Sequence, residues 1–245
     1  MLGTTLVVLS DAHLGDAPSA VTEAFLAFLD EAPRLGDALL LNGDLFDFWF
    51  CYRHVMPRHG FQVAAALART ARQMRVAMVG GNHDRWGDTF WPSEAGLEFQ
   101  PVSLRFQIGA RQVLATHGDG LTETRPSARL LHRLIASPLT VGTFRLLHPD
   151  LAYALVKRLA PHLGDEPRPE PQMLAIATGR QREWARQQFQ QDPALGLIVL
   201  GHTHHPALET FEGGQTYLNP GAWFDGFRYA IATETTAELR SWTSA

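Results

Sequence analysis

Five short segments of the chain carry side chains of the kinds that bind divalent metal ions. Each combines Asp, His or Asn, and most include a glycine; they are Asp11-Ala12-His13, Gly43-Asp44, Gly81-Asn82-His83, His117 and Gly201-His202-Thr203-His204. Carboxylates, imidazoles and an amide suit Mn²⁺, Fe or Zn²⁺, and none of the five segments offers a soft thiolate. A carboxylate has two oxygens and can bridge two cations. These residue types therefore favour metal chemistry at one shared site.

Apolar runs in front of these segments predict the strands that position them. The runs cover residues 4–9, 38–41, 75–79, 112–116 and 197–200, and each stops just before a metal-binding segment. Continuous apolar runs of this length are typical of strands buried on both faces. Ligands of open α/β sheets bind at the carboxyl ends of the strands. If these strands are neighbours, all five segments meet at one edge, and the alternate residues of Asp-x-His and His-x-His face the same side.

Each segment taken alone also has an ordinary structural interpretation. Asp11 and His13 could cap a following helix. Gly43-Asp44 could form a plain turn, and so could Asn82 and His83 after two glycines. His117 could be a core histidine. His202 and His204 indicate some metal even in isolation. The joint pattern favours the metal centre, because five independent turns at strand ends are not expected to carry ligand types every time.

The rest of the sequence predicts further helices and strands of an α/β fold. Residues 19–33 and 62–74 have helical patterns, the first of them ended by Pro33 and Gly36. Further strands are predicted at 103–108, 227–233 and 237–242, with hairpin turns at 109–110 and 213–214. Residues 121–186 break this rhythm with a helical pattern that prolines interrupt. We interpret them as a helical insertion, or cap.

Length and composition fit a single domain over residues 1–245. The 45% hydrophobic content suffices for one substantial core. A general nucleic-acid binder usually has a strong basic excess, so the net charge of −4 predicts no stable nucleic-acid partner. The single cysteine, Cys51, excludes an internal disulfide. No apolar run approaches the roughly 18 residues that cross a bilayer, and no signal-peptide pattern is present. We therefore expect a cytoplasmic protein.

The order and spacing of the motifs resemble those of the calcineurin-like metallophosphoesterases. The matching set is Asp11-x-His13, Gly43-Asp44-x-x-Asp47, Gly81-Asn82-His83-Asp84, His117 and Gly201-His202-x-His204. The resemblance implies a four-layer α/β/β/α sandwich, here with a helical insertion, and a centre of two divalent metal ions. It implies Asp11, His13, Asp44 and His204 as ligands of one ion, and Asp44, Asn82, His117 and His202 as ligands of the other. Asp44 would bridge the two ions, for which Mn²⁺ is expected and Fe or Zn²⁺ are alternatives.

Three further residues of the matching motifs are predicted to take part in catalysis. Two cations about 3.5–4 Å apart lower the pKa of bound water and clamp phosphoryl oxygens, which favours hydrolysis of phosphate esters or anhydrides. His83 lies beside Asn82 and is predicted to donate a proton to the leaving oxygen or to stabilise charge on it. An imidazole in that role needs an orienting carboxylate. Asp47 and Asp84 are both candidates, and the resemblance favours Asp47.

One branch of this family is especially similar. The segments from Gly43 to Trp49, His117 to Asp119 and Gly201 to Pro206 resemble those of the UDP-2,3-diacylglucosamine pyrophosphatases. That resemblance implies hydrolysis of a pyrophosphate bond in lipid A biosynthesis, at the inner face of the inner membrane. The products would be UMP and 2,3-diacylglucosamine 1-phosphate. His83 departs from the best-studied form of this branch, which has Arg there. The alternative is a phosphodiesterase or nucleotide hydrolase with a soluble substrate.

The insertion is basic and amphipathic, which favours an anionic lipid or membrane surface as a partner. Between residues 121 and 164 the chain has six basic and two acidic residues, interleaved with leucines and other apolar residues. Such helices can rest on an anionic membrane or bind an anionic lipid; the alternative is an ordinary cap with its apolar face on the core. We predict a phosphate-containing small molecule as partner, specifically a nucleotide-linked glycolipid, and peripheral contact with the inner membrane. The predicted substrate contacts are Asp119, Arg125 and Arg129, and no oligomeric state is predicted.

Overall fold

Two β-sheets form the centre of the fold in a computed structural model that describes residues 1–15, 18–122, 137–159 and 170–243. The first sheet has the strand order β11 (Ala237–Ser241), β10 (Arg228–Thr233), β1 (Thr5–Leu9), β2 (Ala38–Asn42), β3 (Arg75–Val79) and β4 (Glu98–Gln100). The second has the order β5 (Ser103–Ile108), β6 (Arg111–Thr116), β7 (Leu195–Val199), β9 (Thr216–Asn219) and β8 (Ala207–Thr210).

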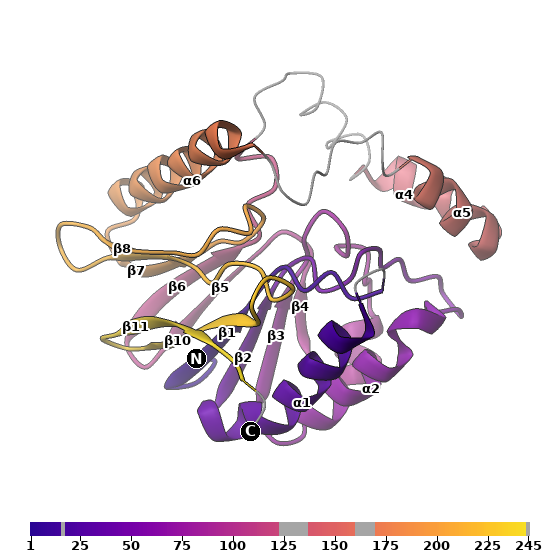
Figure 1. The fold of residues 1–245 in the computed structure, drawn as a ribbon, viewed down its shortest axis with the longest axis horizontal. Helices are drawn as coiled ribbons and strands as arrows, with labels where there is room; N and C mark the ends of the chain where they lie inside the picture. The colour runs from indigo at the N-terminus through magenta and orange to yellow at the C-terminus, as the bar shows by residue number, and fades with distance from the viewer. Residues whose placement is uncertain (16–17, 123–136, 160–169, 244–245) are drawn as a thin grey trace.

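The two sheets and the helices outside them make four layers (Figure 1). Val8 and Leu40 of the first sheet share a buried apolar cluster with Val113 and Leu197 of the second, which places one core between the sheets. Helices α1 (Ser19–Leu35) and α2 (Phe61–Thr70) cover the outer face of the first sheet. Helix α6 (Pro171–Gln191) covers the outer face of the second, where Ala185 and Phe189 join a third cluster. The predicted α/β/β/α sandwich is confirmed.

Parallel pairing brings the five predicted metal-binding segments to one edge of the fold. Strands β1, β2 and β3 are parallel neighbours, and so are β6 and β7. The loops that follow them continue the pairing: the N–H of Ala12 donates to the carbonyl of Asp44 at 2.9 Å, and that of Gly201 to the carbonyl of His117 at 2.9 Å. The expectation that these strands are neighbours is therefore confirmed within each sheet.

A helical hairpin lies within the range predicted as an insertion. It consists of α4 (Pro138–Phe144) and α5 (Pro149–Leu159), which lie apart from α6 in Figure 1. Aromatic rings attach the hairpin to the loop after β2: Phe144 lies 4.7 Å from Phe50, and Tyr153 lies 4.9 Å from Phe48, between ring centroids. Most of helix α6 also falls in the predicted range of residues 121–186, although the helix extends to Gln191 and forms the outer layer of the second sheet.

Two local features differ from the sequence predictions. Helix α1 continues through Pro33 to Leu35 and is capped by Gly36, so Gly36 ends it as predicted and Pro33 does not. The proline removes one N–H in the last turn, and the next turn is closed by the N–H of Gly36 on the carbonyl of Ala32 at 3.2 Å. The short, polar strand β4 was not predicted. Two single helical turns, η1 (Arg58–Gly60) and η2 (Trp91–Ala95), complete the elements that the structure describes.

Candidate metal centre

Six of the seven predicted metal ligands form two compact groups at the carboxyl ends of the strands. One group is Asp11, His13 and His204; the other is Asp44, His117 and His202. Within each group the ligand atoms lie within 4.8 Å of one another. The groups adjoin, because His13 Nε2 is 3.9 Å from Asp44 Oδ2, and His117 Nε2 is 3.9 Å from Asp11 Oδ1. The spacing suits two neighbouring cations.

Asn82, the seventh predicted ligand, sits in the loop between the same groups. Its side-chain oxygen is buried. The backbone N–H of the next residue, His83, donates to Asp44 Oδ1 at 3.0 Å, which ties this loop to the second group. The loop after β3 is thus held against the loop after β2.

Unusual backbone conformations aim these side chains. Seven non-glycine residues in the described ranges have a positive φ, and five of them are predicted ligands: Asp11, His13, Asp44, His202 and His204. The left-handed region is unfavourable for residues with a Cβ, at a cost of about 1–2 kcal/mol each. Conformations of this kind persist only where the surrounding structure imposes them, and they cluster at functional sites.

Two glycines allow the close approach of neighbouring loops. A Cβ at Gly81 would overlap the carboxylate and the backbone nitrogen of Asp44, and a Cβ at Gly201 would overlap the hydroxyl of Ser10. That hydroxyl in turn donates to Asp11 Oδ2. A side chain at either position would push two ligand loops apart.

The buried carboxylates and imidazoles strongly influence one another. Burial alone would raise the pKa of Asp44, but His117 and His83 outweigh it and hold that pKa well below its usual range. Burial would lower the pKa of His117, but Asp44 and Asp11 raise it to about 10. Burial lowers the pKa of His202 to about 4. Asp44 and His117 therefore each favour the charged form of the other.

The donor set fits divalent metal ions. Asp11, Asp44 and His117 are fully buried, where ionisable groups are costly unless they are paired or bind cations. The Nε2 atom of His13 is buried and has no hydrogen-bond partner among the residues that the structure describes. His117 Nδ1 donates to the carbonyl of Asn42 at 2.9 Å, which leaves Nε2 to face the centre. The arrangement supports carboxylate and imidazole coordination.

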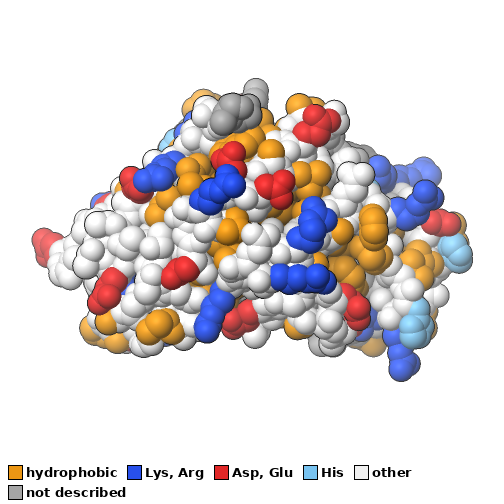
Figure 2. Space-filling model, turned by 90° about the horizontal axis from the view of Figure 1, so that it is seen from below, with side chains coloured by type: hydrophobic (Ala, Val, Ile, Leu, Met, Phe, Trp, Pro, Cys, Tyr) orange, Lys and Arg blue, Asp and Glu red, His pale blue; other side chains and the backbone are white. Residues whose placement is uncertain are grey.

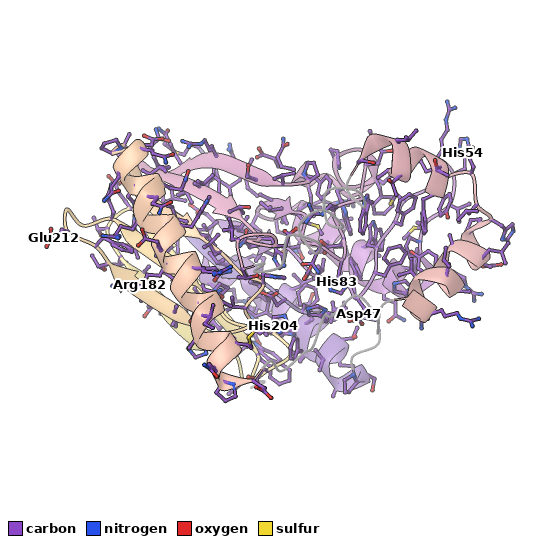
Figure 3. All side chains as sticks on the ribbon, turned by 90° about the horizontal axis from the view of Figure 1, so that it is seen from above. Asp47, His54, His83, Arg182, His204 and Glu212 are labelled. Atoms are coloured by element: carbon purple, nitrogen blue, oxygen red, sulfur yellow. The ribbon has the colours of Figure 1, made fainter. Side chains whose placement is uncertain are left out.

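Two of the predicted catalytic residues, Asp47 and His83, lie at this centre (Figure 3). Seen from above, Asp47, His83 and His204 lie close together, whereas His54 and Glu212 lie at opposite ends of the molecule. His83 Nδ1 is 2.7 Å from the backbone carbonyl of Asp47, and a carbonyl only accepts, so Nδ1 carries the proton. The ring therefore presents Nε2 to the centre, 4.0 Å from Asp44 Oδ2.

The carboxylates of the two orienting candidates have different contacts. Asp47 Oδ1 lies 3.4 Å from His13 Nδ1, so this residue contacts one imidazole through its side chain and His83 through its backbone. Asp84 is fully buried and accepts from the backbone N–H groups of Gly81 at 2.8 Å, Leu45 at 2.7 Å and Asp44 at 3.3 Å. Burial, together with Asp44, raises its pKa to about 6. Asp84 thus joins the loops after β2 and β3.

Only one of the three predicted substrate contacts lies among the residues that the structure describes. Asp119 forms an ion pair with Arg85, whose Nε also donates to the carbonyl of Gly81 at 2.9 Å. Arg125 and Arg129 lie outside the described residues.

Several residues of the site's surroundings were not found by sequence reasoning. Phe224 packs against the rings of His13 and His204, with centroids 5.5 and 5.0 Å away. Asn219 ends β9 as a buried amide that donates to the carbonyl of Gly201 at 3.0 Å. Asn219 follows an apolar strand just as the ligand segments do, and that pattern was the available signal.

This fold and this centre define an enzyme that acts on phosphate esters. Residues 4–206 match the family described as calcineurin-like phosphoesterase, and the chain belongs to that family.

Curated relatives span most of the chain. A UDP-2,3-diacylglucosamine hydrolase of Porphyromonas gingivalis (strain ATCC BAA-308 / W83) is 25% identical and covers 95% of each chain. A protein of the same name from Ectopseudomonas mendocina (strain ymp) is 29% identical and covers 84% of each chain. Among solved structures, Yfce, a phosphoesterase from E. coli, has 16% identity and a TM-score of 0.44, covering 97% of this chain and 98% of that one.

Proposed function

We propose that this chain hydrolyses the pyrophosphate bond of UDP-2,3-diacylglucosamine, releasing UMP and 2,3-diacylglucosamine 1-phosphate for lipid A biosynthesis. The proposal that the chain is a hydrolase rests on the two adjoining ligand groups at the strand ends. The choice of substrate is supported by the relatives, which bear the name UDP-2,3-diacylglucosamine hydrolase at 24–29% identity over most of their length.

The metal ions would be held by the two groups together with Asn82. Asp11, His13 and His204 would bind one ion and His117 and His202 the other, with Asp44 shared. When bound, two such ions activate water and offset negative charge on phosphoryl oxygens. Oxygen and imidazole donors suit Mn²⁺, which we take as the metal, with Fe or Zn²⁺ as the alternatives.

His83 is the proposed proton donor to the leaving oxygen. The carbonyl of Asp47 fixes its ring, so that Nε2 is the nitrogen available on the side of Asp44. Asp47 would orient this imidazole, and Asp84 would keep the loops after β2 and β3 in register through its three backbone contacts.

The α4–α5 hairpin would take part in recognition of the lipid. Leu139 on α4 and Leu146 in the link to α5 are 82% and 86% exposed; Arg145 lies in the same link, and Lys157 and Arg158 lie on α5. Exposed apolar side chains next to basic ones suit an anionic lipid or membrane surface. We therefore propose peripheral contact of this hairpin with the inner membrane at its cytoplasmic face. The described helices include none with the length and hydropathy to span a bilayer.

The face seen from below (Figure 2) does not have the charge pattern of a nucleic-acid-binding surface. Figure 2 shows basic and acidic side chains dispersed among hydrophobic ones, with no continuous basic field among the described residues of that face. Phosphate-backbone binding normally relies on clustered Lys and Arg.

Two substrates distinguish the proposed function from its alternative. Purified protein with Mn²⁺ is assayed on UDP-2,3-diacylglucosamine in mixed micelles and on bis(p-nitrophenyl) phosphate. The proposal predicts release of UMP with kcat/KM far above that for the soluble diester. Strong activity on soluble diesters without release of UMP from the lipid would identify a soluble-substrate phosphodiesterase instead.

A further inference from the structure

Gln181 is a fully buried side chain that lies behind the metal centre and is not one of its ligands. The other polar side chains of α6 are exposed or partly buried, whereas Gln181 is 0% exposed. Its Nε2 donates to the carbonyl of Gly201 at 2.8 Å. Its Oε1 accepts hydrogen bonds from Thr203 Oγ1 at 3.3 Å, Tyr217 Oη at 3.0 Å and Asn219 Nδ2 at 3.3 Å. The amide group therefore uses both its donor and its acceptor inside the protein.

Two of these contacts fix the loop of residues 201–204 on both sides of His202. Gln181 binds the carbonyl group before His202 and the hydroxyl group of Thr203 after it. Asn219 reinforces both contacts, because its Nδ2 lies 3.0 Å from the Gly201 carbonyl and 3.1 Å from Thr203 Oγ1. Buried amides thus bind the Gly201 carbonyl and the Thr203 hydroxyl, and the imidazoles of the loop face the centre.

The loop needs such support because its backbone is strained. His202 has a φ of 68° and His204 a φ of 58°, in the left-handed region that residues with a Cβ avoid. Strained conformations relax when the contacts that impose them are removed. Relaxation here would turn both imidazoles away from their present directions.

Gln181 also borders the other ligand loop of the second sheet. A Cβ at Gly118, the residue after His117, would lie 2.9 Å from Gln181 Nε2. The two loops are linked directly by the N–H of Gly201 and the carbonyl of His117 at 2.9 Å. One helical side chain therefore packs where both imidazole-bearing loops meet.

We propose that Gln181 is a positioning residue for the metal centre. By fixing the 201–204 loop, it keeps His202 and His204 directed at the two metal positions before any ion binds. It contacts neither the ions nor the substrate. The inference rests on the proposed function only in requiring that the wild-type protein binds metal ions. Replacing a group that orients a metal ligand typically lowers metal affinity about 10–100-fold.

Calorimetric titration of Mn²⁺ into metal-free protein tests this role. Gln181→Met keeps the length of the side chain and removes all four hydrogen bonds. The matched control is Gln187→Met, on the exposed side of the same helix, where the side chain donates to Glu183 at 2.9 Å. We expect Gln181→Met to bind Mn²⁺ about 10–100-fold more weakly at both positions, since the loop gives one imidazole to each group. Gln187→Met should match the wild type.

Gln181→Glu separates hydrogen bonding from packing. It keeps an acceptor for Tyr217 but places a carboxylate oxygen against the Gly201 carbonyl, so we expect binding at least as weak as in Gln181→Met. Saturating Mn²⁺ should restore kcat of Gln181→Met with KM unchanged, which loss of the active-site structure would not allow. Equal Mn²⁺ affinity of Gln181→Met and wild type overturns the proposal. Absence of Mn²⁺ binding by the wild type would instead overturn the proposed function.

A milder variant covers the case in which Gln181→Met does not fold, as judged by circular dichroism. Thr203→Val removes only the hydroxyl contacts to Gln181 and Asn219. We expect it to fold and to bind Mn²⁺ more weakly than the wild type. Unchanged affinity in that variant would contradict the role of the buried amides.

Discussion

The metal centre and the α4–α5 hairpin are held by the chain in opposite ways. Asp11, Asp44 and His117 are fully buried at the ends of sheet strands, and hydrogen bonds of backbone groups fix the loops that carry them. The hairpin instead leaves Leu139 and Leu146 largely exposed and contacts the loop after β2 through aromatic rings. Groups that must keep a fixed geometry follow rigid strands, whereas the groups that we propose to contact a lipid are held by apolar contacts that tolerate adjustment.

The largest expected effect comes from Asp44→Ala. Asp44 lies within 4 Å of three imidazoles, those of His117, His13 and His83, and is the predicted bridge between the ions. The variant should lose at least one metal ion per chain and all measurable turnover, while Asp30→Ala, an exposed change on α1, should lose neither. Metal content is measured by mass spectrometry of the purified proteins. Two retained ions with full activity would refute the bridging role.

His83→Ala should separate catalysis from metal binding. The Nε2 atom of His83 faces the centre, but His83 belongs to neither ligand group. We expect turnover to fall by about 10²–10⁴-fold, the range for general acid–base groups, with two metal ions retained. His54→Ala, at the far end of the molecule in Figure 3, is the control and should behave as wild type. Loss of both ions in His83→Ala would assign this residue to coordination instead.

Metal affinity should depend on pH through His117. In the metal-free protein burial lowers its pKa, but Asp44 and Asp11 outweigh burial and raise it to about 10, whereas burial lowers that of His202 to about 4. A metal ion binds neutral imidazole, so binding near neutral pH releases about one proton, from His117. Apparent affinity should therefore rise about tenfold per pH unit above neutrality and level off near about pH 10. Calorimetry in buffers of different ionisation enthalpy measures the proton, and none released would contradict this assignment.

The smallest effect is expected at the hairpin and only with a lipid substrate. Leu139→Gln with Leu146→Gln removes two exposed apolar side chains. If each leucine inserts partly into a lipid surface, it contributes about 1 kcal/mol to the free energy of binding. Binding of the double variant to anionic vesicles should then be weaker by about tenfold or more. Hydrolysis of bis(p-nitrophenyl) phosphate should not change. Val102→Gln, at a residue that is also exposed but lies between β4 and β5, is the control. Equal vesicle binding of all three proteins would remove the hairpin from lipid recognition.

The strand ends could be predicted from the sequence because apolar runs and polar segments alternate sharply there. Strand β3 occupies Arg75–Val79, as its apolar run predicts, and Gly80 follows at once. The two sheets could not be derived from such runs alone, since β4 is short and polar. The family resemblance supplied that part of the architecture.

The supporting contacts of the centre could not be predicted for a different reason. Gln181 lies in a helix rich in Gln and Arg, where most polar side chains face solvent, and only tertiary packing makes it buried. Asp47 contacts His83 through a backbone carbonyl, a contact available to any residue type. The metal ligands could thus be predicted from residue type, whereas the groups that support them depend on the three-dimensional arrangement.

Anomalous diffraction from crystals grown with Mn²⁺ tests the central claim most directly. The account predicts two peaks about 3.5–4 Å apart, one in contact with Asp11, His13 and His204 and the other with His117 and His202, with Asp44 touching both. A single peak, or peaks away from these side chains, would contradict it.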